Sequence, residues 1–365
     1  MIKKISKIII PEIFYYDFFL NNFKEKSDII SYNHQYISLN GKVCRHFKQT
    51  LNKYKLMFII KIIYDFFIFY QVYKKNLKNG EIVIVEGLYP SLYLYLFNLI
   101  KKREIKFIYY NTDWLVDYNY KNIFQKILNN FFWKKLNFFL IEKSIFSISN
   151  SKSVINEYNK NYKNISKKNY YITAPFTINK NNQIQNKSII KIIFLGVVKD
   201  HEIFNNFLNK INMYLENSNK KIIVNFYGPI NDEMLKLKCI SKKNYSFAKF
   251  NGYLDQNLIK KTILKHDFGL HLHNTTSYSN YVVPSKVFFY LSNQVPIITN
   301  KNPEIERIMN KFSIGILIED IDKNPKIEID KIFKKKSFYK KNILKFNTFS
   351  KENFFKDFIK IINYL

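Results

Sequence analysis

The chain has 365 residues, of which 47% are hydrophobic, so it is long enough for about two domains and apolar enough to bury a core in each. Its 59 Lys and Arg residues outnumber its 28 Asp and Glu residues, and the net charge of +31 favours acidic partners such as nucleotides or anionic lipid headgroups. The basic residues are scattered and show no zinc-finger spacing or RNA-recognition signature, so no nucleic-acid partner is expected.

The start of the chain and the cysteines bear on the cellular compartment. The first residues combine a basic beginning with an apolar run, but Pro11 and Glu12 interrupt the run, which predicts a first strand instead of a signal peptide. The two cysteines, Cys44 and Cys239, lie in different halves, which argues against a disulfide framework and favours a reducing compartment. No apolar stretch is long enough to span a bilayer, so a cytoplasmic protein is expected.

The first half of the chain predicts an α/β unit over residues 1–175. Its predicted strands are separated by helical segments and cover residues 7–10, 82–86, 107–110 and 147–149. Two segments, 54–73 and 120–142, are rich in aromatic residues with Lys between them. Amphipathic helices of this kind suit the surface of an anionic membrane, and the alternative is a helix packed on the sheet. Peripheral association with the inner face of the plasma membrane is therefore a hypothesis.

The second half predicts another α/β unit, over residues 188–345, after a polar linker. Near its middle come, in order, a strand, a polar loop, a helix and a second strand, at residues 268–272, 274–280, 285–291 and 295–299. The loop opens at the carboxyl edge of a parallel sheet, where ligands of open α/β folds bind. Ser350 is placed to cap a final helix within residues 346–365.

The helix start at residues 284–286 predicts an anion site. Pro284 has the fixed φ of a first turn, Ser285 can satisfy a free backbone amide, and Lys286 places a cation beside the positive end of the helix dipole. Such a start favours a phosphate group. The alternative is a well-capped helix without a ligand.

A longer pattern surrounds this helix start. Residues 284–291 read PSKVFFYL and are followed by Gln294, Pro296 and an apolar strand, and further matching segments are KIIFLG, VNFYGP, FNGYLDQNLIKKTILKHDFGL and PEIERIMNKFSIGILIED. In these residues the chain resembles the sugar-nucleotide half of bacterial GT-B glycosyltransferases, similar to the transferases of capsule, O-antigen and exopolysaccharide synthesis. The resemblance implies two Rossmann-like α/β domains facing each other across a cleft, with the terminal helix crossing back to the first domain.

The resemblance also implies an activity and a donor site. The enzyme would be a hexosyltransferase that moves a sugar from a UDP- or GDP-linked donor to a glycan or lipid-linked acceptor, without a cofactor or metal. Lys286 would stabilise the departing diphosphate, on which charge develops in the transition state, and Lys199 would be a second cation. Donor contacts are implied for Gly196, Lys199, Tyr227, Gly228, Gly252, Tyr253, His273, Tyr281, Pro284, Ser285 and Lys286.

The acceptor is implied to lie against the first domain, near residues 86–91 and 110–114, which both follow predicted strands. Asp113 is the candidate general base, because a carboxylate can accept the proton of the attacking hydroxyl. The alternative for Asp113 is an ordinary helix start, and Glu86 is the second choice.

Departures from the family pattern leave alternatives open. Retaining relatives often carry two Glu residues whose positions here are near Tyr281 and Phe289, and Gln294 replaces the usual Gly of the turn. The stereochemistry is therefore open. A sugar-nucleotide epimerase and a non-catalytic nucleotide-binding partner protein remain alternatives.

Two residue pairs have side chains of the types that bind metal ions. Asp320 and Asp322 form a D-x-D pair, but it follows a late strand instead of lying within a nucleotide-binding region. His271 and His273 would share one face of a strand but lack a third ligand, so a polar role near the donor sugar or phosphate is preferred.

Overall fold

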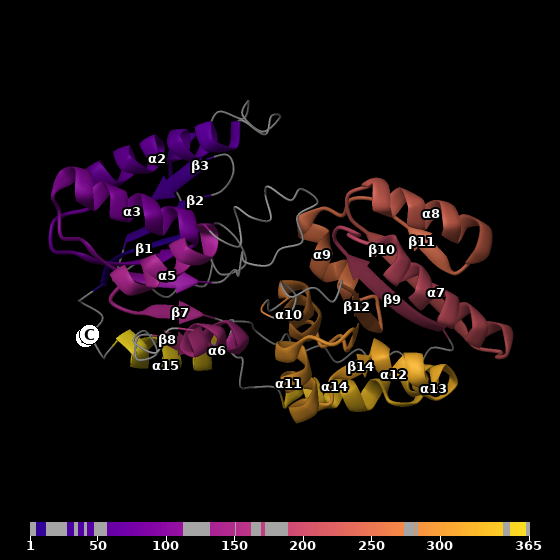
Figure 1. Ribbon diagram of the computed structural model, residues 1–365. Coiled ribbons are helices and arrows are strands. Elements are labelled where there is room, and N and C mark those ends of the chain that lie inside the picture. Colours follow the sequence, from indigo (N-terminus) through magenta and orange to yellow (C-terminus); the bar gives the residue numbers. More distant parts are fainter. Residues whose placement is uncertain are drawn as a thin grey trace. The chain divides into compact units, whose positions relative to one another are not determined.

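Figure 1 shows the computed structural model of the chain, which describes residues 5–11, 28–32, 36–39, 42–46, 57–111, 132–149, 151–161, 169–171, 189–273, 281, 284–345 and 351–362. The chain divides into two compact units. One consists of Met1–Pro175 together with Lys351–Leu365, and the other of Phe176–Ser350. Each unit has its own β-sheet.

In the described part of the first unit, eight strands form a sheet in the order β4-β3-β2-β1-β5-β6-β7-β8. The parallel strands are β1 (Ile5–Pro11), β2 (Asp28–Tyr32), β5 (Ile82–Glu86), β6 (Lys106–Asn111), β7 (Ser147–Ser149) and β8 (Asn169–Tyr171). The edge strands β3 (Tyr36–Leu39) and β4 (Lys42–His46) are antiparallel. The strand order reverses between β1 and β5, as in doubly wound sheets.

The helices described in the first unit are α2 (Met57–Asn76), α3 (Leu88–Lys101), α5 (Lys134–Lys143), α6 (Lys152–Asn161) and α15 (Lys351–Ile362). Aromatic side chains join α2 to α3, with the ring centroids of Phe69 and Tyr93 5.3 Å apart and those of Tyr73 and Phe97 5.9 Å apart. Much of the first aromatic segment is therefore core. Among the described residues, no helix is long and apolar enough to cross a membrane.

The sheet of the second unit is parallel throughout, in the order β11-β10-β9-β12-β13-β14. Its strands are β9 (Ile189–Leu195), β10 (Lys221–Tyr227), β11 (Ala248–Phe250), β12 (Phe268–His271), β13 (Ile297–Thr299) and β14 (Gly315–Leu317). The chain builds outward from β9 to β11, then crosses to β12 and builds outward on the other side. The switch point of this Rossmann order lies between the carboxyl ends of β9 and β12.

Five helices alternate with these strands (Figure 1): α7 (His201–Glu216), α8 (Asp232–Asn244), α9 (Gln256–Ile263), α10 (Ser285–Ser292) and α11 (Pro303–Phe312). Three more follow β14 in succession: α12 (Ile318–Lys323), α13 (Pro325–Lys334) and α14 (Lys336–Leu344). Asp200 and Asn231 cap α7 and α8 by accepting hydrogen bonds from first-turn amides. The apolar faces of α7 and α8 bury Phe204, Leu208 and Leu237 beside the sheet. The predicted α/β class with two Rossmann-like domains is confirmed.

Candidate functional site

Glycine turns follow the central strands of the second unit. Gly196 after β9 and Gly228 after β10 have φ angles of 116° and 156°, which L side chains rarely adopt. A Cβ atom on Gly228 would lie 2.0 Å from the carbonyl oxygen of Gly196. The Gly228 amide donates to the carbonyl of Gly252, which has φ of 72°. Glycine is therefore required where the carboxyl ends of these strands come together.

Lys286 lies across the end of β9. A Cβ atom on Gly196 would be 2.3 Å from the Lys286 Nζ, so a larger residue at this position would displace the ammonium group from the end of β9. The Nζ also sits 5.1 Å from the ring centroid of Phe194. Burial, with a smaller effect from the positive charge of Lys199, lowers the pKa of Lys286 to about 8. No carboxylate among the described residues forms an ion pair with it, so this half-buried ammonium group has no anionic partner in the part of the chain that the structure describes.

The amino end of α10 adds backbone donors to this cation. Pro284 occupies the cap position with φ −69° and ψ 113°, and the helix begins at Ser285. The cap residue is thus a proline, which makes no side-chain hydrogen bond, and the side chain of Ser285 lies outside what the structure describes, so its predicted bond to a free amide stays a prediction. The first amides of a helix have no intrahelical acceptor and carry the positive end of its dipole. Lys286 and α10 thus direct positive charge to the same end of the helix.

Tyr290 fixes α10 against the two strands at the switch point. Its hydroxyl accepts a hydrogen bond from the Leu195 amide at 3.0 Å and donates to the Leu270 carbonyl at 3.4 Å. Gly269 permits this approach, since a Cβ atom there would lie 2.2 Å from the Tyr290 ring. Sequence analysis missed this anchor, although Tyr290 stands within the PSKVFFYL run and Gly269 interrupts an apolar strand.

The turn after α10 resolves one departure from the family pattern. Gln294 has φ of 57°, the left-handed conformation that a glycine adopts at the end of a helix. Its amide and that of Val295 bond back to the carbonyls of Leu291 and Tyr290. Gln294 therefore takes the backbone conformation that the usual glycine favours, and strand β13 begins at Ile297 instead of the predicted residue 295.

Two stacked histidines end β12. The ring centroids of His271 and His273 are 5.2 Å apart with an interplanar angle of 18°. Burial is the largest cause that lowers the pKa of each imidazole, and for His271 the neighbouring His273 and Lys286 act in the same direction. Both rings are therefore neutral near pH 7. Their ring nitrogens are buried and make no hydrogen bond of acceptable geometry among the described residues, although the Asn300 side chain is close enough to the His273 ring to oppose part of the lowering of its pKa.

The remaining predicted donor residues differ in how far their side chains are exposed to solvent. Lys199 is exposed after β9 and is close enough to affect the pKa of Lys286 and of both histidines. Tyr227 ends β10 and is half-buried, whereas Tyr253 is 81% exposed. Tyr281 is half-buried. The structure thus brings Gly196, Gly228, Lys286 and the β12 histidines together at the carboxyl edge of the sheet.

In the first unit, the predicted general base Asp113 lies outside the described residues. Glu86, the second choice, is 3% exposed at the end of β5. Gly87 follows it with φ of 92° and donates its amide hydrogen to the Tyr110 carbonyl. Glu86 therefore lies at the strand end next to the switch point between β1 and β5.

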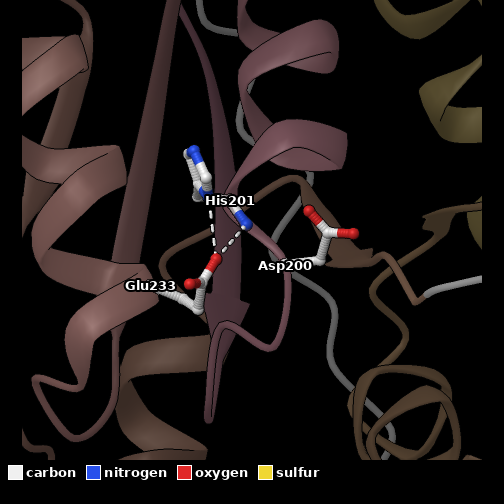
Figure 2. A group of neighbouring side chains, drawn as sticks. All are labelled: Asp200, His201 and Glu233. Atoms are coloured by element: carbon white, nitrogen blue, oxygen red, sulfur yellow. Dashed lines mark hydrogen bonds and ion pairs between the residues drawn. The ribbon is translucent and has the colours of Figure 1, made fainter. Parts of the chain in front are cut away.

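One group of described residues, Asp200, His201 and Glu233, has three metal-binding side chains close together, with ligand atoms within 4.8 Å of one another. The dashed lines in Figure 2 join only His201 and Glu233, whose Nδ1 and Oε2 atoms are 2.7 Å apart. Glu233 also pairs with Lys236, which, followed by His201, lowers the pKa of the Glu233 carboxyl to about 2. Asp200 caps α7 instead. Hydrogen bonds and ion pairs within the protein are therefore sufficient to explain why these three side chains lie close together.

The D-x-D pair forms no such group. Asp320 and Asp322 both lie in α12, and Asp322 forms an ion pair with Lys210 of α7. Residues two positions apart in a helix point in different directions, so the two carboxylates do not converge on one ion.

The comparisons with known proteins agree with this geometry. Residues 203–359 match the family model described as glucosyltransferase 3-like, C-terminal domain. No curated protein sequence matches the chain.

Solved structures share the fold over almost the whole chain. The lipopolysaccharide outer core galactosyltransferase WaaB, in its apo form, is 12% identical, with a TM-score of 0.61 over 99% of this chain and 100% of its own. Sucrose-phosphate synthase from Thermosynechococcus elongatus is 9% identical, with a TM-score of 0.65 over 98% of each chain. HepE from Anabaena, solved with UDP and glucose, is 8% identical, with a TM-score of 0.59 over 99% and 100%. The chain therefore has the GT-B fold of bacterial glycosyltransferases, and its second unit resembles the C-terminal domain of the glucosyltransferase 3-like family.

Proposed function

We propose that the chain is a glycosyltransferase that transfers a sugar from a UDP- or GDP-linked donor to a glycan or lipid-linked acceptor in surface polysaccharide synthesis. The observation that carries this proposal is Lys286, a half-buried ammonium group with a lowered pKa and no anionic partner among the described residues, at the amino end of α10. It lies at the switch point of a Rossmann sheet, where nucleotides bind in this class of fold. The WaaB and HepE structures are consistent with such a donor.

Lys286 would act on the leaving group. As the bond between the sugar and the diphosphate breaks, negative charge grows on the departing oxygen, and a cation fixed beside it lowers the barrier. The α10 amides supply further donors at no cost in reorganisation. Lys199, which is exposed after β9, would add a second positive charge near Lys286. With two lysines and a helix end in these roles, the proposed reaction needs no metal ion.

A peripheral membrane location belongs to the same proposal, since lipid-linked acceptors are held at a membrane. Ile63 and Phe67, one turn apart on α2, are 51% and 57% exposed, and Lys74 and Lys75 end the helix. Phe132 before α5 is 51% exposed. Exposed apolar side chains with nearby lysines favour an anionic lipid surface.

The test is a thermal-shift panel of UDP, GDP, CMP and dTDP with and without EDTA, comparing the wild type with Lys286→Met. One nucleoside diphosphate is expected to raise the wild-type melting temperature equally with and without EDTA, because a ligand that binds the native state stabilises it. Lys286→Met should lose most of this shift. Lys238→Met, in an exposed position on α8, is the matched control and should respond like the wild type.

The outcomes separate the possible functions. Loss of the shift in EDTA would show that a metal takes part in binding, and no shift with any nucleotide would contradict the donor proposal. A non-catalytic nucleotide-binding partner is the second candidate, favoured by the absence of an acidic side chain at Tyr281 and Phe289. A nucleotide shift without sugar transfer or donor hydrolysis would support this candidate.

A further inference from the structure

Unsatisfied polar atoms are concentrated at one place in the second unit. Of the seven buried side-chain nitrogen and oxygen atoms without a hydrogen-bond partner among its described residues, five belong to His271, His273 and Glu319. The other two are hydroxyls of Ser218 and Ser241. A buried polar group without a partner costs folding free energy, so a cluster of five requires an explanation.

Backbone contacts hold these three side chains at the same sheet edge. The Asn300 side chain accepts a hydrogen bond from the His273 amide at 3.1 Å and donates one to the His273 carbonyl, which ties the end of β12 to the end of β13. The next residue, Lys301, donates its amide hydrogen to Glu319 Oε1 at 2.8 Å. Glu319 directly follows Ile318, the first residue of α12 after β14. Glu319 Oε2 is left buried and without a partner.

The two stacked imidazoles lie between groups of opposite charge. Burial is the largest cause that lowers the pKa of each ring; Lys286 lowers that of His271 further, whereas the Asn300 side chain and then the Glu319 carboxylate act to raise that of His273. Lys199 acts on both rings. The row of groups formed by Lys286, His271, His273 and Glu319 therefore has a cation beside His271 and a carboxylate beside His273.

The chemistry of the row selects the ligand. A neutral imidazole offers one donor and one acceptor, and a carboxylate offers acceptors only. A phosphate at pH 7 has acceptors only and would be repelled by Glu319. A hydroxyl group is both donor and acceptor, so it can pair with every one of these atoms. A metal ion fits less well, because the two imidazoles are stacked nearly parallel instead of converging on one point.

We propose that His271, His273 and Glu319 form the sugar-binding part of the donor site, in which the imidazoles and the Glu319 carboxylate bind hydroxyl groups of the transferred sugar. This inference rests on the proposed function, in which Lys286 and α10 bind the diphosphate of the same donor. Glu319 then supplies the hydroxyl-binding carboxylate that is absent at Tyr281 and Phe289.

The test compares nucleoside diphosphates with sugar nucleotides by isothermal titration calorimetry of the full-length protein. UDP, GDP, UDP-glucose, UDP-galactose, UDP-N-acetylglucosamine and GDP-mannose are titrated into the wild type, and the best-bound sugar nucleotide and its parent diphosphate are titrated into Glu319→Gln and His271→Leu. Each variant is expected to bind the diphosphate within about twofold of the wild type and the sugar nucleotide about tenfold more weakly, the size expected for the loss of one buried hydrogen bond.

The controls exclude a structural effect. Glutamine at 319 keeps the acceptor for the Lys301 amide, so the melting temperature of Glu319→Gln should equal that of the wild type. Glu306→Gln removes a neighbouring carboxylate that forms an exposed ion pair with Lys301, and it should change neither affinity.

An equal loss of affinity for the diphosphate and the sugar nucleotide, or no loss for either, would overturn the sugar-binding assignment. A wild-type protein that binds none of the six compounds would overturn the proposed function as well. The wild-type titrations therefore distinguish failure of the function from failure of the assignment.

Discussion

Burial disfavours the positive charge of Lys286 and lowers its pKa to about 8, so its protonation changes just above neutral pH. In the ligand-free protein its pKa is about 8, below the ordinary value of 10.5, so the ammonium loses its proton as the pH rises through about 8. A bound diphosphate favours the protonated form. Binding above pH 8 must therefore take up a proton, and affinity must fall as the pH rises.

We expect the dissociation constant of the best nucleoside diphosphate to increase about tenfold between pH 7.5 and 9.5, because Lys286 is then mostly neutral before binding. The terminal phosphate is ionised throughout this range and contributes little to the change. Calorimetric titration at several pH values measures the effect. Lys286→Met should bind weakly with an almost flat profile, and an equally steep profile in this variant would assign the pH dependence to another group.

At the scale of secondary-structure elements, the position of α10 depends on a few tertiary contacts that could not be predicted from the helix sequence alone. Tyr290 joins the helix to β9 and β12 through its hydroxyl, and Gly269 leaves space for the ring. Gln294 ends the helix in a left-handed conformation. These contacts place Lys286 relative to the strand ends, so the chemistry at one end of α10 depends on packing near the other end.

Tyr290→Phe is expected to lower the free energy of unfolding by about 1–3 kcal/mol, because the Leu195 amide loses its acceptor beside the fully buried Tyr290 side chain. Chemical denaturation measures this change. Tyr245→Phe is the matched control, since its hydroxyl bonds to the Asn205 side chain at a partly exposed position, and it should cost less than about 1 kcal/mol. Equal costs in the two variants would show that the Tyr290 hydroxyl does not secure α10.

At the scale of the whole molecule, the net charge of +31 acts together with the exposed apolar side chains of α2. We expect the full-length protein to co-sediment with anionic liposomes at low salt and to bind less at high salt, because counterions screen exposed charges. Ile63→Ser with Phe67→Ser should reduce this binding, whereas Leu235→Ser, at an exposed site on α8, should not. A protein that ignores anionic liposomes at low salt would contradict the peripheral membrane hypothesis.

The sequence predicted the fold well where the signals are local. Apolar runs located β5, β6 and β7, and the PSK start located α10 within a residue. The antiparallel edge formed by β2, β3 and β4 was missed, because its strands are short and carry polar residues such as Ser31, Ser38 and Lys42. Such strands lack the continuous hydrophobic pattern that marks buried parallel strands.

The candidate site was predicted less completely, because its members come together only through the strand order. Gly196 and Lys286 are 90 positions apart, and the contact between them exists only once β9 and α10 are packed. Nothing in the sequence marked Glu319 as a site residue, since a single Glu after a short strand is common. Its distinguishing property is the unpaired Oε2 atom, which depends on the burial of that atom in the folded unit.

The assignment of α15 to the first unit has a consequence for biosynthesis. Phe358 and Ile361 of this helix are buried, yet the whole of Phe176–Ser350 is translated before they leave the ribosome. The first half of the chain is thus synthesised first but receives these buried side chains only after the intervening unit has been translated and has had time to fold. A nascent chain halted near residue 350 should therefore carry a protease-resistant second unit and a first unit that is still susceptible.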